Sequence, residues 1–326
     1  MHRHIIDLFA GPGGWSEGLR RLGHTDTGLE IDAAACATRA AAGHRTIRTD
    51  VAAYPTAPLV GKVSGLIGSP PCQTFSAAGL HAGADDIALC RQALDDLAAG
   101  RDTRTALRAE CTDPRSLLVV EPLRFALDTR PNWITLEEVP AVAPLFAHTA
   151  RILRTLGYSA WVGILNAADF GIPQTRRRAF LIASRTQEVT PPLPTHARTP
   201  EPESLFGPGR AAWVTMADAL DLTAGAVVTR GEHHTGGNRF TTTGPAWALT
   251  GRARSWKLRP ADQPTAEREL DATEAGALQD FPARYPWAGS RTKQFEQIGN
   301  AIPPGLAAAV LRTVLESARL SLVVAA

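Results

Sequence analysis

Short apolar runs alternate with helical patterns along the first part of the chain. The runs that predict β-strands lie at 5–9, 27–32, 46–50, 63–68, 133–136 and 179–183, and the helical patterns lie at 15–22, 33–42 and 146–156. Because strand and helix follow each other at this spacing, we expect parallel strands joined by right-handed crossovers. The predicted fold class is therefore α/β with a mostly parallel sheet.

The pattern changes after residue 184. Prolines and glycines replace the regular alternation there, which predicts a linker and irregular β structure. Helical patterns return at 271–279 and again at 304–320. We therefore predict an α/β domain made of residues 1–184 and 272–326, with a smaller, irregular and β-rich domain inserted at 185–271.

Composition limits the class of protein. The chain has 326 residues, of which 44% are hydrophobic, so it can bury a core of one large domain or two ordinary ones. Its cysteines, at positions 36, 72, 90 and 111, show no close pairing. That spacing argues against a zinc site or a disulfide framework and favours a reducing cytosol. We expect no bound metal.

The two ends of the chain argue against membrane insertion. The amino-terminal apolar stretch is too short for a signal peptide and runs straight into a glycine turn. The carboxyl-terminal apolar stretch is interrupted by Arg312, Glu316 and Arg319. The sequence predicts a soluble cytoplasmic protein.

Basic residues are concentrated within the inserted segment, although the net charge of the whole chain is only +2. Between positions 230 and 259 there are six basic residues and one acid, Glu232, and Trp247 and Trp256 lie among them. Such a stretch is typical of a surface that binds nucleic acid. A solvated face of an arginine-rich chain would show the same excess.

Cys72 is the strongest candidate for a nucleophile. It follows Pro70 and Pro71 directly after the apolar run 63–68. Two prolines cannot continue a sheet, so they place the next side chain at the carboxyl end of a strand, where open α/β sheets bind ligands. A lone cysteine is also commonly a small buried core residue.

A glycine turn at 10–14 is the second candidate site. It follows the first strand, and acids end the next two strands, with Glu30 and Asp32 at the second and Asp50 at the third. Glycines let a ligand approach the backbone, and an acid in this place can bind ribose hydroxyls. The turn departs from the Gly-x-Gly-x-x-Gly dinucleotide fingerprint, which weakens the case for NAD.

With these motifs in place, the chain resembles the cytosine-C5 DNA methyltransferases. The residues that carry the resemblance, in family order, are Pro70-Pro71-Cys72-Gln73, Glu137-Glu138-Val139, Gln174-Thr175-Arg176-Arg177-Arg178, Arg268-Glu269-Leu270 and Gln297-Ile298-Gly299-Asn300 with Pro303-Pro304. The resemblance spans the first 184 and the last 55 residues. It implies a Rossmann-like methyltransferase domain and a target-recognition domain at 185–271.

The resemblance assigns roles in catalysis. Cytosine C5 is a poor nucleophile, so the Cys72 thiolate would add to C6 and form a covalent adduct. Glu137 would supply or share a proton at N3, which a raised pKa from burial would favour. Arg178, together with Arg176, would hold the cytosine O2.

The resemblance also implies S-adenosylmethionine as methyl donor and S-adenosylhomocysteine as product. The residues implied in cofactor binding are Phe9, Ala10, Gly11, Gly13, Gly14, Glu30, Ile31, Asp50, Val51, Pro70 and Asn300. Within this set Glu30 would bind the ribose and Asp50 the adenine.

The implied partner is double-stranded DNA carrying a specific sequence, from which the target cytosine is flipped out of the helix. The residues assigned to DNA are Gln73, Ser76, Gln174, Arg230, Arg239, Arg252, Arg254 and Lys257. We expect a monomer associated with the nucleoid, in a restriction–modification or phage DNA-modification setting with a cognate restriction endonuclease as partner.

The sequence departs from the family pattern at two places. Glu138 stands where the family usually has asparagine, and the link from Phe75 to Arg115 is lengthened by a predicted helix at 85–111 with apolar positions Leu89, Leu94 and Leu97. That helix would either contact DNA or pack against the domain. Two other functions remain open: a transfer RNA cytosine methyltransferase, and a catalytically inactive DNA-binding protein on the same scaffold.

Overall fold

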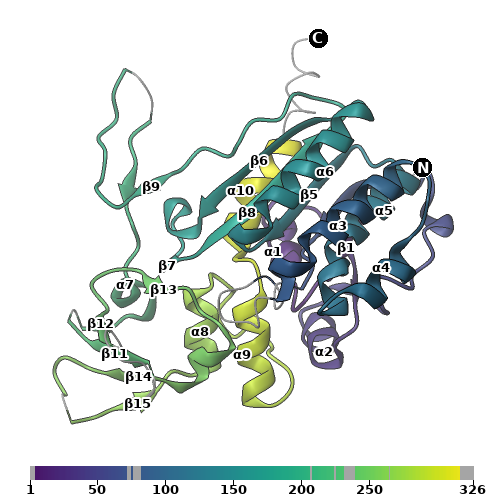
Figure 1. Ribbon diagram of the computed structural model, residues 1–326. Helices are drawn as coiled ribbons and strands as arrows, with labels where there is room; N and C mark the ends of the chain where they lie inside the picture. The colour runs from purple at the N-terminus through teal and green to yellow at the C-terminus, as the bar shows by residue number, and fades with distance from the viewer. Residues whose placement is uncertain are drawn as a thin grey trace.

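The computed structural model describes residues 4–71, 75, 82–205, 208–223, 225–230, 239–263 and 265–315. It contains a large α/β body and a smaller lobe beside it (Figure 1). The body is built on a seven-stranded sheet in the order β3-β2-β1-β4-β5-β8-β6. In chain order these strands are β1 (His4–Leu8), β2 (Thr27–Glu30), β3 (Arg45–Arg48), β4 (Val63–Gly68), β5 (Trp133–Glu138), β6 (Ser159–Asn166) and β8 (Arg177–Ser184).

The sheet is mostly parallel, which confirms the predicted fold class. Strands β3, β2, β1, β4 and β5 pair in parallel, whereas β8 runs antiparallel to both of its neighbours, β5 and β6. Residues 179–183 were predicted as one of the parallel strands, and the structure corrects this, because β8 runs antiparallel to both of its neighbours in the seven-stranded sheet. The carboxyl ends of the parallel strands therefore share one edge, where ligands bind in open α/β sheets.

Helices cover both faces of this sheet (Figure 1). One apolar cluster includes residues of α3 (Ala82–Ala98), α5 (Glu121–Thr129) and α6 (Ala143–Thr155). A second cluster includes residues of α1 (Gly14–Arg21) and α10 (Pro304–Leu315). Helix α2 (Ala33–Ala41) begins at Asp32, whose carboxylate accepts from the amides of Ala34 and Ala35 as an N-cap. The first and last described helices of the chain thus share one core.

The segment predicted as one helix at 85–111 forms two. Helix α3 ends before Gly100, which has φ +75°, and α4 (Arg104–Glu110) follows. Cys90, Ala93 and Leu94 on α3 are at most 1% exposed. Asp86 accepts from the backbone amides of Thr112 and Asp113. Of the two roles that the sequence left open, packing against the domain is the one the structure shows for α3.

The lobe contains a four-stranded antiparallel sheet in the order β12-β11-β14-β15. Its strands are β11 (Val227–Arg230), β12 (Arg239–Thr241), β14 (Trp256–Arg259) and β15 (Arg268–Glu269). The remaining elements of the 185–315 region are β9 (His196–Ala197), β10 (Ala211–Ala212), α7 (Met216–Leu220), β13 (Ala246–Trp247), α8 (Ala272–Leu278) and α9 (Arg291–Asn300). Strand β13 pairs in parallel with β7 (Gln174–Thr175), which ties the lobe to the body.

The apolar cluster of the lobe extends beyond residue 271. Val228 and Leu258 of its sheet share one buried cluster with Leu278 of α8 and with Phe295 and Ile298 of α9. The predicted domain boundary at 271/272 therefore passes through a single cluster, and the division of the chain stays a prediction.

The sequence analysis did not predict β6 or α9. Strand β6 lies at the edge of the sheet and is mostly half-buried, although its residues 160–165 are apolar apart from Gly163. Helix α9 is polar except for the few positions that face the lobe, with Phe295 and Ile298 buried. The stretch Arg291–Leu315 is long and apolar enough to cross a membrane. However, 67% of its apolar 18-residue portion is buried inside the protein, as in a core helix.

Candidate functional site

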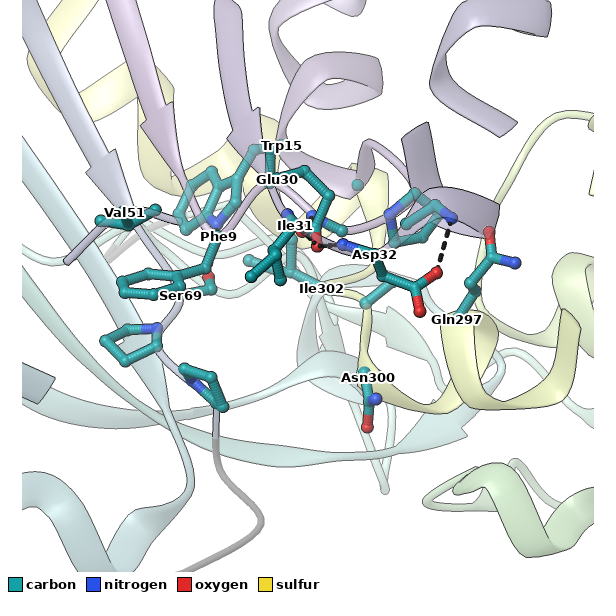
Figure 2. Close-up of a pocket in the computed structure, with 18 of the residues that line it drawn as sticks. Phe9, Trp15, Glu30, Ile31, Asp32, Val51, Ser69, Gln297, Asn300 and Ile302 are labelled. Carbon is teal, nitrogen blue, oxygen red and sulfur yellow. Dashed lines mark hydrogen bonds between the residues drawn. The ribbon is translucent and has the colours of Figure 1, made fainter. Parts of the chain in front are cut away.

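A cavity of about 370 Å³ opens at the carboxyl ends of β1, β2, β4 and β5. Figure 2 shows side chains from several of these strand ends around it. Its lining includes the residues that the sequence assigned to cofactor and catalysis: Phe9, Ala10, Gly11, Gly14, Glu30, Ile31, Asp50, Val51, Pro70, Glu137, Arg176, Arg178 and Asn300. The tertiary structure thus brings these separate motifs to one place.

The glycine turn forms one wall of the cavity. At two of its positions, Gly13 and Gly14, there is no space for a side chain. Gly13 has φ +107°, and a Cβ there would lie 2.9 Å from the His44 ring. A Cβ on Gly14 would lie 2.2 Å from the carbonyl oxygen of Ile302. Gly14 lines the cavity, whereas Gly13 is not among the lining residues and faces His44 instead. Gly13 was predicted to bind the cofactor, and the structure gives it a role in packing.

Glu30 is the carboxylate at the end of β2, and it is held by backbone amides (Figure 2). Its Oε2 accepts from Gly11 at 2.8 Å, and its Oε1 accepts from Ile31 at 2.8 Å and Asp32 at 2.7 Å. A carboxylate has about four lone-pair positions, so Glu30 keeps capacity for a hydroxyl donor from a ligand. The same group therefore shapes the glycine turn and offers an acceptor to the cavity.

The residues that follow β2 and β3 give the cavity one polar and one apolar side. Asp50 accepts from the amide of Ala52 through Oδ1, which leaves Oδ2 toward other donors. Val51 is buried, and Ile31 is 62% exposed at the cavity. Together with Phe9, these apolar side chains can enclose a flat ring whose polar edge meets Asp50.

The chain that leads to the predicted nucleophile is anchored at the end of β4. Ser69 donates its amide to the carbonyl of Leu8 and accepts from Trp15 Nε1 at 2.9 Å. Pro70 and Pro71 then line the cavity. Cys72, Gln73 and Ser76 lie outside the described residues.

A pair of opposite charges lies on the other side of the cavity. Arg178 Nε is 3.2 Å from Glu137 Oε1, and both side chains are largely buried. The antiparallel register of β5 and β8 brings them together, since Glu137 lies opposite Phe180 and Glu138 opposite Ala179. Burial raises the pKa of Glu138 well above its ordinary value.

Gln174 and Arg176 hold the lobe against the body. Gln174 is fully buried, donates to the Leu278 carbonyl and to Gln279, and accepts from the Leu249 amide. Arg176 is 1% exposed and donates to the carbonyls of Leu249 and Gly299 at 3.0 and 2.8 Å. Gln174 was predicted to contact DNA; in this structure its amide is buried and its polar atoms bond within the protein, and the DNA contact stays a prediction. Arg176 lines the cavity, but its guanidinium is committed to backbone carbonyls.

The basic residues of the lobe fall into two groups. Arg230 lies 3.9 Å over the Trp247 ring, and Lys257 and Arg259 are both paired with Glu267. Trp256 is 5% exposed. These side chains are engaged within the lobe.

The other group remains open to solvent. Arg239, Arg252 and Arg254 are exposed and make no ion pair among the described residues. The local excess of positive charge at 230–259 is therefore smaller in the folded lobe than in the sequence, because Glu267 pairs with Lys257 and Arg259.

Several lining residues were missed by the sequence analysis. They include Trp15, Ser69, Arg108, Leu118, Lys293, Glu296 and Ile302. Ile302 and Glu296 flank the Gln297 to Asn300 motif, so their place near Asn300 was available from the sequence. Arg108 was not, because it comes from α4 in the segment whose packing only the tertiary structure decides.

Comparisons with known proteins agree with this geometry. The family model described as C-5 cytosine-specific DNA methylase matches residues 3–89, 105–222 and 223–316. The Type II methyltransferase M1.HphI of Haemophilus parahaemolyticus is 28% identical, over 97% of this chain and 87% of the relative. The Type II methyltransferase M.AplI of Arthrospira platensis is 29% identical, over 95% of this chain and 85% of the relative.

Solved structures share the fold. The Dnmt2 methyltransferase of S. pombe superposes with a TM-score of 0.69 at 17% identity and covers 98% of this chain and 100% of that one. The Entamoeba histolytica methyltransferase EhMeth has a TM-score of 0.64 at 14% identity, with 98% and 99% covered. At these identities the likeness concerns the fold alone.

Proposed function

The chain belongs to the C-5 cytosine-specific DNA methylase family, and from this premise we propose that it methylates C5 of a flipped-out cytosine in double-stranded DNA with S-adenosylmethionine. The observation that carries the proposal is the single cavity at the strand ends. Glu30 lies at one side of this cavity and the Glu137–Arg178 pair at the other. Pro70 and Pro71, which directly precede Cys72 in the chain, also line it. One cavity can thus receive both the methyl donor and the base.

The residues present fit S-adenosylmethionine. The Glu30 carboxylate is fixed by three backbone amides and is suited to accept from ribose hydroxyls. Ile31, Phe9 and Val51 suit the faces of an adenine ring, and Asp50 suits its amino group. When bound, the cofactor supplies an electrophilic methyl group.

The protein residues would carry out the remaining chemistry. The Cys72 thiolate forms a bond to C6, and the electron pair moves toward N3, where Glu137 provides or shares a proton. Arg178 offers fixed positive charge beside the ring as it gains electrons. After C5 has taken the methyl group, a base removes the C5 proton, and the electron pair of that bond expels Cys72.

The lobe is our candidate for target recognition. A base inside a duplex is out of reach of the cavity, and extruding it costs a few kcal/mol, so a second surface must hold the DNA. Arg239, Arg252 and Arg254 are the exposed cations suited to this role. The Type II methyltransferases among its relatives favour a restriction–modification setting, with a cognate endonuclease as partner.

Labelled S-adenosylmethionine tests this proposal. Incubation with duplex DNA should place label on cytosine C5, and parallel incubation with transfer RNA distinguishes the alternative substrate. DNA that contains fluorocytosine should become covalently attached to the protein, since the C5 substituent cannot then leave.

Cys72→Ser should lower methylation on the order of 10³-fold or more and abolish the adduct. Cys111→Ser, at a buried cysteine that is not among the residues lining the cavity, is the matched control and should retain both. Full activity in Cys72→Ser would contradict the assigned nucleophile, and label on transfer RNA alone would contradict the DNA substrate.

A further inference from the structure

Glu138 is a buried carboxyl group at the cavity that lacks the partners of a carboxylate. It ends β5 and is 2% exposed. Its Oε2 accepts a hydrogen bond from the amide of Val139, the following residue. Its Oε1 is buried and has no hydrogen-bond partner among the described residues. A buried ionised carboxylate normally gathers several donors or a cation, because losing water is costly.

The cation nearest in the site is already engaged. Arg178 places Nε 3.2 Å from Glu137 Oε1. The charged groups that act on Glu138 are Glu137, which opposes its ionisation, and Arg178, which favours it. Arg176 lines the same cavity but donates to the carbonyls of Leu249 and Gly299. Among the groups that act on Glu138, two carboxyl groups therefore share one guanidinium, and Glu137 holds it.

Burial also favours the neutral form of Glu138. Desolvation is the largest influence on Glu138 and raises its pKa well above 4.5, and the neighbouring Glu137 raises it further. The Val139 amide and Arg178 lower it, but by less. A neutral carboxylic acid costs less in these contacts than a carboxylate, because one oxygen accepts from Val139 and the other, which has no partner among the described residues, carries a proton and no charge.

We propose that Glu138 is a positioning residue that must remain neutral for activity, because its neutrality leaves Arg178 to Glu137 and to the target base. This proposal rests on the proposed function. An ionised Glu138 would compete for Arg178 and would add negative charge where the cytosine ring gains electrons during thiolate attack. Both effects oppose the transition state.

Glu138→Gln tests the proposal because the amide has the same shape and cannot ionise. Single-turnover methylation should be measured from about pH 6 to about pH 10. Near neutral pH we expect the variant to keep its rate within about threefold of the original protein. At alkaline pH the original protein should lose rate by up to about tenfold per pH unit as Glu138 ionises, and the variant should lack that loss.

Glu110→Gln is the matched control. Glu110 is exposed on α4, so the same charge change there should leave the alkaline loss in place. Superimposable pH profiles for the original protein and Glu138→Gln would overturn the proposal. A folded Glu138→Gln protein that is inactive at every pH would also overturn it, because the proton of Glu138 would then be required and neutrality would not suffice.

Thermal unfolding against pH gives a readout that does not depend on activity. A group whose folded-state pKa is raised contributes stability at low pH, and this is lost as pH rises from about 4.5 through the folded-state pKa. Glu138→Gln should therefore gain Tm relative to the original protein as pH rises across that window. A constant Tm difference would overturn the proposal. If the original protein methylates no DNA at any pH while this Tm pattern holds, the proposed function fails and the neutrality of Glu138 does not.

Discussion

Single residues in this protein serve the fold and the site at once, and Glu30 is the clearest case. Its carboxylate accepts from Gly11, Ile31 and Asp32 and so closes the glycine turn onto the end of β2. The sequence placed Glu30 at a strand end as a ribose ligand. It did not reveal that the same oxygens hold the wall of the cavity, since those bonds depend on how β1 and β2 align.

Glu30→Gln should weaken the binding of S-adenosylhomocysteine about 10- to 100-fold, because hydrogen bonds to a charged group contribute about 1.5–3 kcal/mol. The amide also places a donor against one of the backbone amides that the carboxylate now accepts from. Isothermal titration calorimetry measures the change, and the affinity for duplex DNA in the absence of cofactor is the control and should not move. Unchanged cofactor affinity would remove Glu30 from the binding site.

Among the secondary-structure elements, the two-residue strand β7 connects the lobe to the body. It pairs with β13 of the lobe, and Gln174 and Arg176 bind Leu249, Leu278 and Gly299 around it. Gly299 directly precedes Asn300, which lines the cavity. The position of the lobe and one wall of the cavity are therefore fixed by the same buried side chains.

Arg176→Met should lower the free energy of unfolding by about 2–4 kcal/mol, because it leaves two buried carbonyls without donors. Arg177→Met is the matched control, since Arg177 is the next residue and is exposed. Its effect should stay within about 0.5 kcal/mol. Urea unfolding followed by circular dichroism measures both, and equal effects of the two substitutions would contradict the role of Arg176 in holding the lobe.

Over the whole molecule, the distribution of charge matters more than its sum. The net charge is +2, and the lobe neutralises part of its own basic stretch through Glu267, which pairs with Lys257 and Arg259. Within the described part of this stretch, the cations left for a phosphate backbone are Arg239, Arg252 and Arg254. We expect binding to DNA to depend on this smaller set.

Arg252→Ala and Arg254→Ala should each reduce the slope of log Kd against log salt concentration by about 1, as expected when one phosphate contact is lost. Lys257→Ala is the comparison, because Lys257 is 3.2 Å from Glu267 and its charge is already compensated. Its slope should change less. Fluorescence anisotropy with a labelled duplex over a range of salt concentrations measures all three, and a larger change for Lys257 would reverse the assignment.

The sequence by itself determined the local features of this protein. Strand and helix alternate through residue 184, the glycine turn follows β1, and Glu30 and Asp50 follow the next strands, so the fold class and the cavity edge were predictable. These features depend on backbone preferences and on the spacing of apolar positions, and both are set by residues close together in the sequence. The order of the motifs also predicted the family, which the family model confirms.

Only the tertiary structure decided how those features are used. It buried Gln174, committed Arg176 to two carbonyls, packed α3 against the body and paired Lys257 with Glu267. It also placed Arg178 beside Glu137, and within the described part of the chain Glu138 forms no ion pair. Burial and charge pairing depend on which distant segments come into contact, and the register of β5 and β8 sets that contact here. The pattern along the chain therefore could not show whether Glu137 or Glu138 would pair with Arg178.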